Sequence, residues 1–151
     1  MENNSLNLRV ATPEDYGFLF QLQRSTMKDY VQQTWGWDET WQQEYFQQHF
    51  NPASCQIINS RGEDIGVLSV ESGSEEILLH NIQLIPEYQG KGIGTSLINS
   101  ILEEARQSGR QVALQVLKVN PARRLYERLG FIEIGQTETH YLMKALPSTS
   151  A

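Results

Sequence analysis

The chain has 151 residues, of which 39% are hydrophobic and 20% are charged. This composition is typical of one soluble domain with its own core, and we expect that domain to cover residues 1–146, followed by a flexible tail at 147–151. A formal net charge of −6 without a run of Lys or Arg argues against nucleic acid or a membrane surface as the partner. Cys55 is the only cysteine, which excludes an internal disulfide. With no signal peptide and no long apolar stretch, the sequence indicates a cytoplasmic protein.

The first half of the sequence predicts a strand, two helices and an antiparallel meander. Residues 6–11 alternate as a strand, and Thr12 with Pro13 supplies an N-cap and a first-turn proline for the following helix. The helical pattern breaks at 35–37, after which Asp38 caps a second helix that runs to about residue 50. The next apolar runs are bounded by turn residues and predict three strands, at 54–60, 65–72 and 77–85.

The second half predicts one long helix, one short helix and three more strands. Apolar residues from Ile93 to Ala105 share one helix face, and Gly109 closes that helix. A short helix begins at Asn120 and Pro121 and stops at Gly130. The remaining apolar segments predict strands at 112–119, 131–135 and 140–146.

The segment between the strand at 77–85 and the long helix is rich in glycine. Its glycines allow main-chain N–H groups to approach an anion closely and allow positive φ angles where the chain needs them. The helix that follows directs its unpaired N–H groups and the positive end of its dipole to the same place. A phosphate group fits such a site, which consists of Gln89, Gly90, Lys91, Gly92, Ile93 and Gly94.

Two familiar phosphate-binding patterns do not match this segment. A Walker loop requires Ser or Thr after its Gly-Lys pair, whereas Gly92 follows Lys91. A dinucleotide fingerprint requires a third glycine three residues after Gly94, where Leu97 stands. What remains is the pattern Gln-x-x-Gly-x-Gly.

This pattern resembles the pyrophosphate loop of the GCN5-related N-acetyltransferase (GNAT) family. About 25 residues later a second segment, from Asn120 through Tyr126 to Gly130 and Phe131, resembles that family's other motif, an Asn at a strand exit and a short helix ending in Tyr-x-x-x-Gly-Phe. The two motifs have the family's order and spacing, and the resemblance covers roughly residues 65 to 146. It implies a mixed α/β fold with a twisted, mostly antiparallel sheet of about seven strands flanked by about four helices.

The resemblance also implies the chemistry. The cosubstrate is acetyl-CoA, no metal is required, and the acceptor is a primary amine on a small molecule or a peptide; a homodimer is allowed. In the family a main-chain N–H at the end of the fourth strand holds the thioester carbonyl, which corresponds to Leu84 here. The cofactor-binding residues that carry over are Leu84, Ile85, Gln89, Gly90, Lys91, Gly92, Ile93, Gly94, Thr95, Asn120 and Tyr126.

Tyr126 corresponds to the family's general acid, which protonates the departing thiolate; the alternative is a packed aromatic residue. Asn120 corresponds to the Asn that binds pantetheine or an ordered water, and it also suits helix capping. Lys91 and Arg124 add charge near the phosphates or are simply solvated.

The general base is the open question in the sequence. Family members carry a Glu where Leu78 or Gln115 stands here. His80 matches a histidine of arylalkylamine-type members, and its alternative role is to fill a half-buried strand face. Glu76 and Glu87 are further candidates for the base.

The other histidines and the tryptophans have weaker assignments. His49 and His140 are interpreted as ordinary helix and strand residues. Three tryptophans, at positions 35, 37 and 41, wall an acceptor pocket or pack in the core. The function predicted is acetyl transfer to an amine, and the alternative is a CoA-binding module that has lost turnover.

Overall fold

The structure, a computed structural model, describes residues 6–146, so the predicted tail at 147–151 lies outside the described residues. Its strands form one seven-stranded sheet of order β1-β2-β3-β4-β5-β7-β6. The strands are β1 (Leu6–Val10), β2 (Gln56–Ser60), β3 (Glu63–Ser72), β4 (Glu76–Leu84), β5 (Gln111–Leu117), β6 (Ile132–Gln136) and β7 (His140–Ala145). The α-helices are α1 (Tyr16–Thr34), α2 (Glu39–His49), α3 (Ile93–Ser108) and α4 (Ala122–Arg128). This mixed fold with seven strands and four α-helices confirms the predicted fold class.

The chain divides into two compact units. The first contains the described residues up to Ser69 together with Asn81–Lys91, and the second contains Val70–His80 together with the described residues from Gly92 onward. The chain passes between the units within β3 and β4. That the whole chain is one domain stays a prediction.

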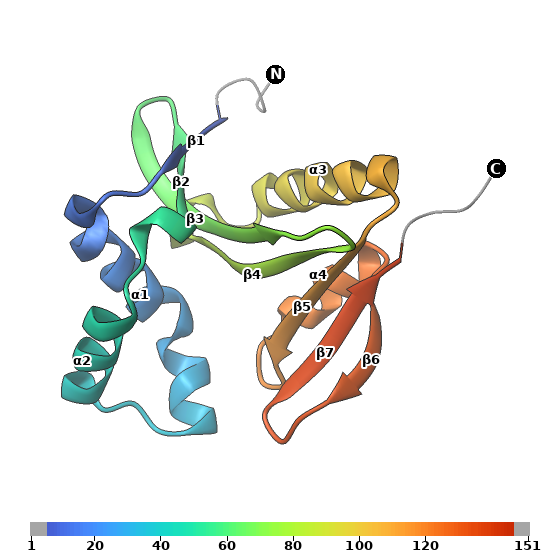
Figure 1. Cartoon of the computed structure of the whole chain (residues 1–151). Coiled ribbons are helices and arrows are strands. Elements are labelled where there is room, and N and C mark those ends of the chain that lie inside the picture. Colours follow the sequence, from blue (N-terminus) through green and yellow to red (C-terminus); the bar gives the residue numbers. More distant parts are fainter. Residues whose placement is uncertain (1–5, 147–151) are drawn as a thin grey trace. The chain divides into compact units, whose positions relative to one another are not determined.

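The first unit packs α1 and α2 on a small apolar core. Leu19 and Leu22 of α1 are buried against Ile57 of β2 and Val67 of β3. Tyr16 of α1 meets two phenylalanines edge-on, with ring centroids 5.2 Å from Phe46 and 5.3 Å from Phe50. Aromatic contacts therefore hold the two helices together. Figure 1 shows α1 and α2 side by side.

Local signals fix the turns of this unit as expected. Only two residues separate β2 from β3, and both have positive φ, 52° at Arg61 and 87° at Gly62. Two consecutive positive φ angles are what a two-residue hairpin turn requires, because they match the twist of the strands. Asp38 caps α2 by accepting a hydrogen bond from Trp41 N, as predicted.

The second unit is built around β5. Residues Glu76–Leu78 of β4 pair with it in parallel, and β7 pairs with its other edge in antiparallel fashion. The last strand thus lies between β5 and β6 (Figure 1). α3 buries Ile98, Ile101 and Ala105 and ends at Gly109, whose φ of 70° closes the helix as predicted.

The structure differs from the sequence expectations at four proline or asparagine turns. Pro13–Asp15 forms a 3-10 helix, so α1 begins at Tyr16 and not directly after Thr12. Pro52–Ser54 forms a 3-10 helix, so β2 begins at Gln56 and not at residue 54. Pro86–Tyr88 forms another 3-10 helix that periodicity could not indicate. β5 ends at Leu117 because the chain turns there, with Asn120 N donating to Leu117 O.

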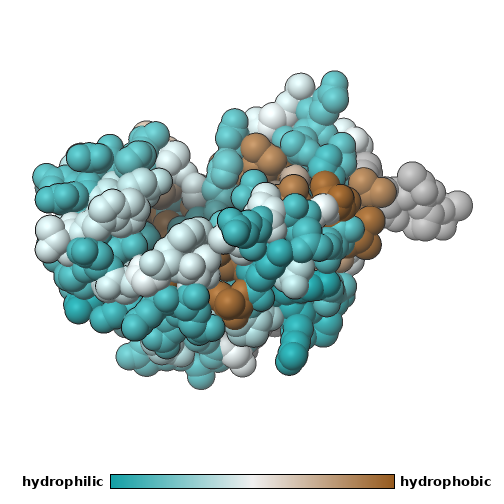
Figure 2. Space-filling model, turned by 90° about the horizontal axis from the view of Figure 1, so that it is seen from below, coloured by the Kyte–Doolittle hydropathy of each residue, from teal (hydrophilic) through white to brown (hydrophobic). Residues whose placement is uncertain are grey.

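The surface carries some large apolar side chains. Trp35 and Trp41 are 60% and 54% exposed, so core packing does not explain them. The face in Figure 2 is mostly hydrophilic or neutral, with hydrophobic residues confined to small areas. Within residues 6–146 no helix is long and apolar enough to cross a membrane.

The close approach of β3 and β4 leads to a stability prediction. A Cβ atom added at Gly66 would lie 2.3 Å from Gln83 O, which is main chain and cannot rotate away. We expect Gly66→Ala to lower the free energy of unfolding by about 1–3 kcal/mol in urea denaturation. Gly17→Ala is the control, since nothing lies within 4 Å of its Cβ position in α1. An equal loss in both variants would contradict the close approach.

The Arg9–Asp15 ion pair leads to a pH prediction. Hydrogen bonding to Arg9 at 2.9 Å lowers the pKa of Asp15 from 3.8 to about 2, and Thr12 N adds a bond of 2.8 Å. Because the folded carboxyl is the stronger acid, this stabilisation is present above about pH 4 and is lost as the pH falls to about 2. It corresponds to a free energy of roughly 2 kcal/mol.

We therefore expect Asp15→Asn to reduce the melting temperature at pH 7 and to weaken the dependence of stability on pH between 5 and 2. Asp29→Asn removes an exposed carboxyl from α1 and is the matched control. Thermal unfolding followed by circular dichroism over this pH range measures both. Parallel curves for Asp15→Asn and the unmodified protein would refute the assignment.

Candidate active site

The glycine-rich segment leaves the N-terminus of α3 open. Gly90 and Gly92 have φ angles of 73° and 84°, which only glycine adopts easily. Gly92 is the N-cap of α3, and no side chain caps the helix. The N–H groups of Ile93, Gly94 and Thr95 belong to the first turn, where a helix has no internal acceptors for them. The start of this 16-residue helix thus offers several donors at the positive end of its dipole.

The space beside these glycines is not filled by protein. A Cβ built at Gly90, Gly92 or Gly94 meets nothing within 4 Å. Gly90 and Gly92 are required by their φ angles, but Gly94 has no positive φ. Neither backbone conformation nor packing against the described residues explains a glycine at position 94. A phosphate held on the first turn of α3 would explain it, so the residues present fit the pyrophosphate of coenzyme A.

At the end of β4, the main-chain N–H groups of Leu84 and Ile85 point to opposite edges of the strand. Ile85 N donates to Ile65 O at 2.8 Å, so this N–H is already used on the side of β3. Because successive residues of a strand direct their N–H groups to opposite edges, Leu84 N–H lies on the edge away from β3. Gln89 Nε2 donates to Leu84 O at 2.8 Å and so fixes the chain at this point. Of these two N–H groups, only that of Leu84 is directed away from β3.

In the second unit, β4 and β5 stay paired over a short distance only. Among the described residues their parallel register covers three pairs, from Glu76 with Gln111 to Leu78 with Ala113. Beyond these pairs, residues of both strands line a cavity of about 530 Å³. Among the described residues, the pairing of β4 with β5 therefore ends at Leu78 and Ala113.

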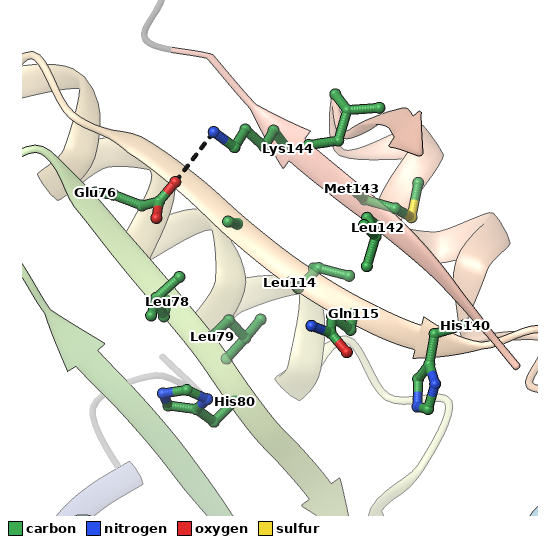
Figure 3. A pocket seen from close by; sticks show the side chains of 12 residues that line it. Glu76, Leu78, Leu79, His80, Leu114, Gln115, His140, Leu142, Met143 and Lys144 are labelled. Atoms are coloured by element: carbon green, nitrogen blue, oxygen red, sulfur yellow. Dashed lines mark ion pairs between the residues drawn. The ribbon is translucent and has the colours of Figure 1, made fainter. Parts of the chain in front are cut away.

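Figure 3 shows how the side chains of this cavity are arranged. Glu76 and Lys144 form an ion pair of 3.2 Å at one end, whereas His80, Gln115 and His140 lie toward the other. Apolar side chains, among them Leu78 and Leu142, lie between the two ends. The two positions at which the family resemblance implies a glutamate, 78 and 115, thus both line the cavity, and neither supplies a carboxylate.

His80 is an exposed residue and not the half-buried strand filler that was its alternative role. Its side chain is 52% exposed, and its Nε2 lies 2.9 Å from Oε1 of Glu71. A carboxylate can only accept, so Nε2 carries a hydrogen and Nδ1 holds the lone pair when the ring is neutral. Glu71 thus selects the tautomer of His80.

His140 also lines this cavity, which the sequence analysis did not predict. Thr139 Oγ1 lies 2.8 Å from its Nδ1, and burial lowers the pKa of His140 below 6.5. Its ring is therefore neutral at pH 7. A histidine at the start of a strand carries no signal of this role, because the cavity forms only when β7 inserts next to β5.

Asn120 and Tyr126 lie at the two ends of α4. Asn120 Oδ1 accepts from Ala122 N at 2.9 Å, but the N-cap of α4 is Pro121, so Asn120 holds the turn before the helix and is not its cap. Its Nδ2 makes no hydrogen bond to another residue within 6–146. Tyr126 stacks edge-on against the buried Phe131 at 5.8 Å. Burial raises the pKa of Tyr126 above 10, so its hydroxyl is protonated at neutral pH. It can serve as a proton donor there.

Three basic residues lie near Asn120. Lys118, Arg123 and Arg124 line an open cavity of about 370 Å³ together with Asn120 and Tyr141. Arg123 is also paired with two glutamates and lies 4.1 Å from the centre of the Tyr141 ring. Arg124 and Asn120 thus line the same cavity, and a role of Arg124 near the phosphates stays a prediction.

The other two charged candidates lie in the first unit. Lys91 is exposed next to the glycines, and Glu87 lies in the exposed turn before Gln89.

No group of three or more His, Cys, Asp or Glu that could hold a metal occurs among residues 6–146.

A third cavity lies wholly in the first unit, and the sequence analysis did not predict it. It has a volume of about 230 Å³ and lies at α1, α2, β3 and β4. Asn81 and Gln83 line it directly before Leu84, and His49 lines it from the end of α2. No sequence pattern indicates that an isolated Asn or Gln, such as Asn81 or Gln83, lines a cavity.

Comparison with known proteins agrees with this geometry. The model of the acetyltransferase (GNAT) family matches residues 19–131. The [ribosomal protein bS18]-alanine N-acetyltransferase of Haemophilus influenzae is 35% identical over 78 residues, which are 51% of this chain and 53% of that protein. The thialysine N-epsilon-acetyltransferase of Mus musculus is 33% identical over 101 residues, 59% of each chain. The chain thus matches little more than half the length of these relatives.

Solved structures show the same fold at low identity. The PaiA N-acetyltransferase of Thermoplasma acidophilum in complex with coenzyme A has a TM-score of 0.74 at 17% identity, over 94% of this chain and 99% of that one. The spermidine N-acetyltransferase of Vibrio cholerae in complex with CoA and spermine has a TM-score of 0.65 at 23% identity, over 95% and 96% of the two chains. With a family model that matches most of its length, the chain belongs to the acetyltransferase (GNAT) family.

Proposed function

We propose that this protein is an N-acetyltransferase that moves the acetyl group of acetyl-CoA to a primary amine. The observation that carries the proposal is the open first turn of α3, where glycines leave uncapped N–H groups and unfilled space. These groups suit the pyrophosphate of acetyl-CoA. Asn120 is the further residue proposed to contact the cosubstrate, through its Nδ2 group.

The protein must stabilise the charge on the carbonyl oxygen, position the amine, remove a proton from the nitrogen and supply a proton to the sulfur. The amine nitrogen attacks the thioester carbonyl carbon, a C–N bond forms, the C–S bond breaks, the nitrogen loses a proton and the sulfur gains one. Leu84 N–H is proposed to stabilise the charge that develops on the carbonyl oxygen, because it lies on the edge of β4 that β3 does not use. The remaining tasks are positioning the amine and moving the two protons.

Tyr126 is proposed to protonate the sulfur. Burial raises the pKa of Tyr126, so it keeps its proton at neutral pH and is able to donate it as the thiolate leaves. General acid catalysis of this kind typically contributes about 10²- to 10⁴-fold.

His80 is proposed to accept the proton of the amine, directly or through water. It lines the cavity at which β4 and β5 part, and Glu71 fixes its tautomer. Since positions 78 and 115 carry Leu and Gln, histidine is the residue type at this cavity best able to accept a proton near neutral pH.

Relatives act on different amines. One is named for the alanine of a ribosomal protein and another for spermidine. For this chain we propose an amine on a small molecule or a peptide as acceptor and a cytoplasmic location, supported by the single free Cys55. A homodimer stays a prediction that light scattering of the purified protein checks.

The experiment that tests the proposal is thiol release from acetyl-CoA with a panel of primary amines. Release that depends on the amine supports an acetyltransferase. Binding of CoA without release from any amine would support a CoA-binding module without turnover instead.

Replacing Tyr126 by Phe tests the general acid. We expect Tyr126→Phe to reduce kcat by about 10²-fold or more with little change in the Kd of CoA, because only the hydroxyl is lost and the ring still packs on Phe131. Tyr88→Phe, which removes an exposed hydroxyl bound to Glu63, is the matched control. If both variants retain full kcat, Tyr126 is not the acid.

Replacing Gly94 by Ala tests whether position 94 serves the ligand. No protein atom lies within 4 Å of the added Cβ and the φ angle is not positive, so we expect unchanged or slightly higher thermal stability. We expect the Kd of CoA to rise about tenfold, because the methyl group occupies space needed by the pyrophosphate. Calorimetry measures both quantities. Unchanged affinity would contradict phosphate binding on this turn.

A further inference from the structure

The cavity in the first unit, here called the α2 pocket, has a lining that indicates what it binds. It is lined by Leu19 and Gln23 of α1, by Tyr45, Phe46 and His49 of α2, and by residues of the following turn, β3 and β4. All twelve lining residues are described, and none is Asp, Glu, Lys or Arg. The pocket lining therefore contains no carboxylate, ammonium or guanidinium group.

The α2 pocket lies next to the group proposed to hold the acyl oxygen. Gln83 lines the pocket, and Leu84 is the next residue along β4. Consecutive residues of a strand are separated by only about 3.3 Å. Both residues belong to the first unit, so this neighbourhood does not depend on the second unit.

The polar side chains of the pocket are held in place. Gln83 Oε1 lies 3.0 Å from Thr26 Oγ1, and Gln83 Nε2 donates to Asn81 Oδ1 at 3.0 Å. Each amide still has donor and acceptor capacity left after these bonds. The two residues can therefore hydrogen-bond a ligand without rearranging.

His49 offers an acceptor on the helix side. Its Nδ1 lies 2.9 Å from Tyr45 O, and because a carbonyl only accepts, Nδ1 must carry the hydrogen. In the neutral ring Nε2 then holds the lone pair. The ring also stacks on Tyr45 with centroids 4.0 Å apart, which fixes its plane.

The rest of the lining is apolar and aromatic. Leu19, Phe46, Phe50 and Val67 supply walls that favour a hydrocarbon or aromatic body. The volume of about 230 Å³ is smaller than the roughly 300–1,000 Å³ typical of pockets for drug-sized ligands. A ligand that fits is small.

We propose that the α2 pocket receives the acceptor and selects a small primary amine with an uncharged, apolar body over a polyamine. This inference rests on the proposed acetyltransferase function. A second ammonium group held against the apolar walls would find no carboxylate in the lining, and a charge that loses water without gaining a partner is costly. The amides and His49 instead bind the single reacting amine, while the apolar walls hold its body.

The test uses the whole chain, acetyl-CoA and three acceptors: phenethylamine, spermidine and a short peptide that begins with alanine. We expect kcat/KM for phenethylamine to exceed that for each of the others by about tenfold or more. Higher kcat/KM for spermidine or for the peptide would overturn the inference and leave the proposed function standing. Absence of thiol release with all amines would overturn both.

Asn81→Asp tests the charge argument directly. The change keeps the shape of the side chain and adds a carboxylate to the lining, so we expect the ratio of kcat/KM for spermidine to that for phenethylamine to rise about tenfold. Gln48→Glu adds the same charge at an exposed position of α2 that does not line the pocket, and should leave the ratio within about twofold. Equal ratios in the two variants would overturn the inference.

Tyr45→Ala provides a test that does not depend on a charge in the pocket. Tyr45 is 47% exposed, so the variant should fold, and we expect the KM of phenethylamine to rise about fivefold while the KM of acetyl-CoA stays unchanged. Gln47→Ala is the control, because Gln47 is also exposed on α2 and does not line the pocket. Equal KM values for phenethylamine in these two variants would contradict the placement of the acceptor.

Discussion

The carboxyl end of β4 is the point on which the proposed chemistry depends. A strand that loses a neighbour on one edge exposes backbone groups there, and such groups need another partner. Ile85 N–H is satisfied by Ile65 O, whereas Leu84 belongs to the opposite edge, where Gln89 binds its carbonyl. The strand is therefore held firmly while one backbone N–H remains directed to the edge that an acyl oxygen can reach. A donor fixed in this way needs no reorganisation during the reaction, which is the property that makes such donors effective.

The glycines after β4 have two separate physical origins. Positions 90 and 92 need glycine because their φ angles are 73° and 84°, so the path from strand to helix depends on them. Position 94 is inside α3, has no positive φ and has free space around it. Only the first pair is required by the fold. A glycine that costs helix stability without easing the backbone indicates a requirement from outside the protein.

Much of the fold could be predicted because the signals are local. The turn at Arg61 and Gly62, the cap at Asp38 and the stop at Gly109 act within a few residues, and the structure has all three. The cavities could not be predicted, since each joins residues from separate elements. His140 faces its cavity only because β7 inserts between β5 and β6, and Asn81 does so only because α1 and α2 cover part of the sheet. The exposure of Trp35 could not be predicted either, because the sequence pattern of a helix does not distinguish a buried aromatic residue from an exposed one.

The lack of a carboxylate base and the uncharged lining of the α2 pocket have a common explanation. An amine attacks only after it has lost its proton, and a carboxylate beside it would favour the ammonium form. A pocket of amides and aromatic rings does the opposite, because loss of water disfavours the charged form and lowers the pKa of a bound amine. The proton can then pass to a histidine or to water, neither of which needs to be a strong base. With Leu at 78 and Gln at 115, the proposed mechanism therefore relies on an environment that weakens the hold of the amine on its proton, in place of a strong base at these two positions.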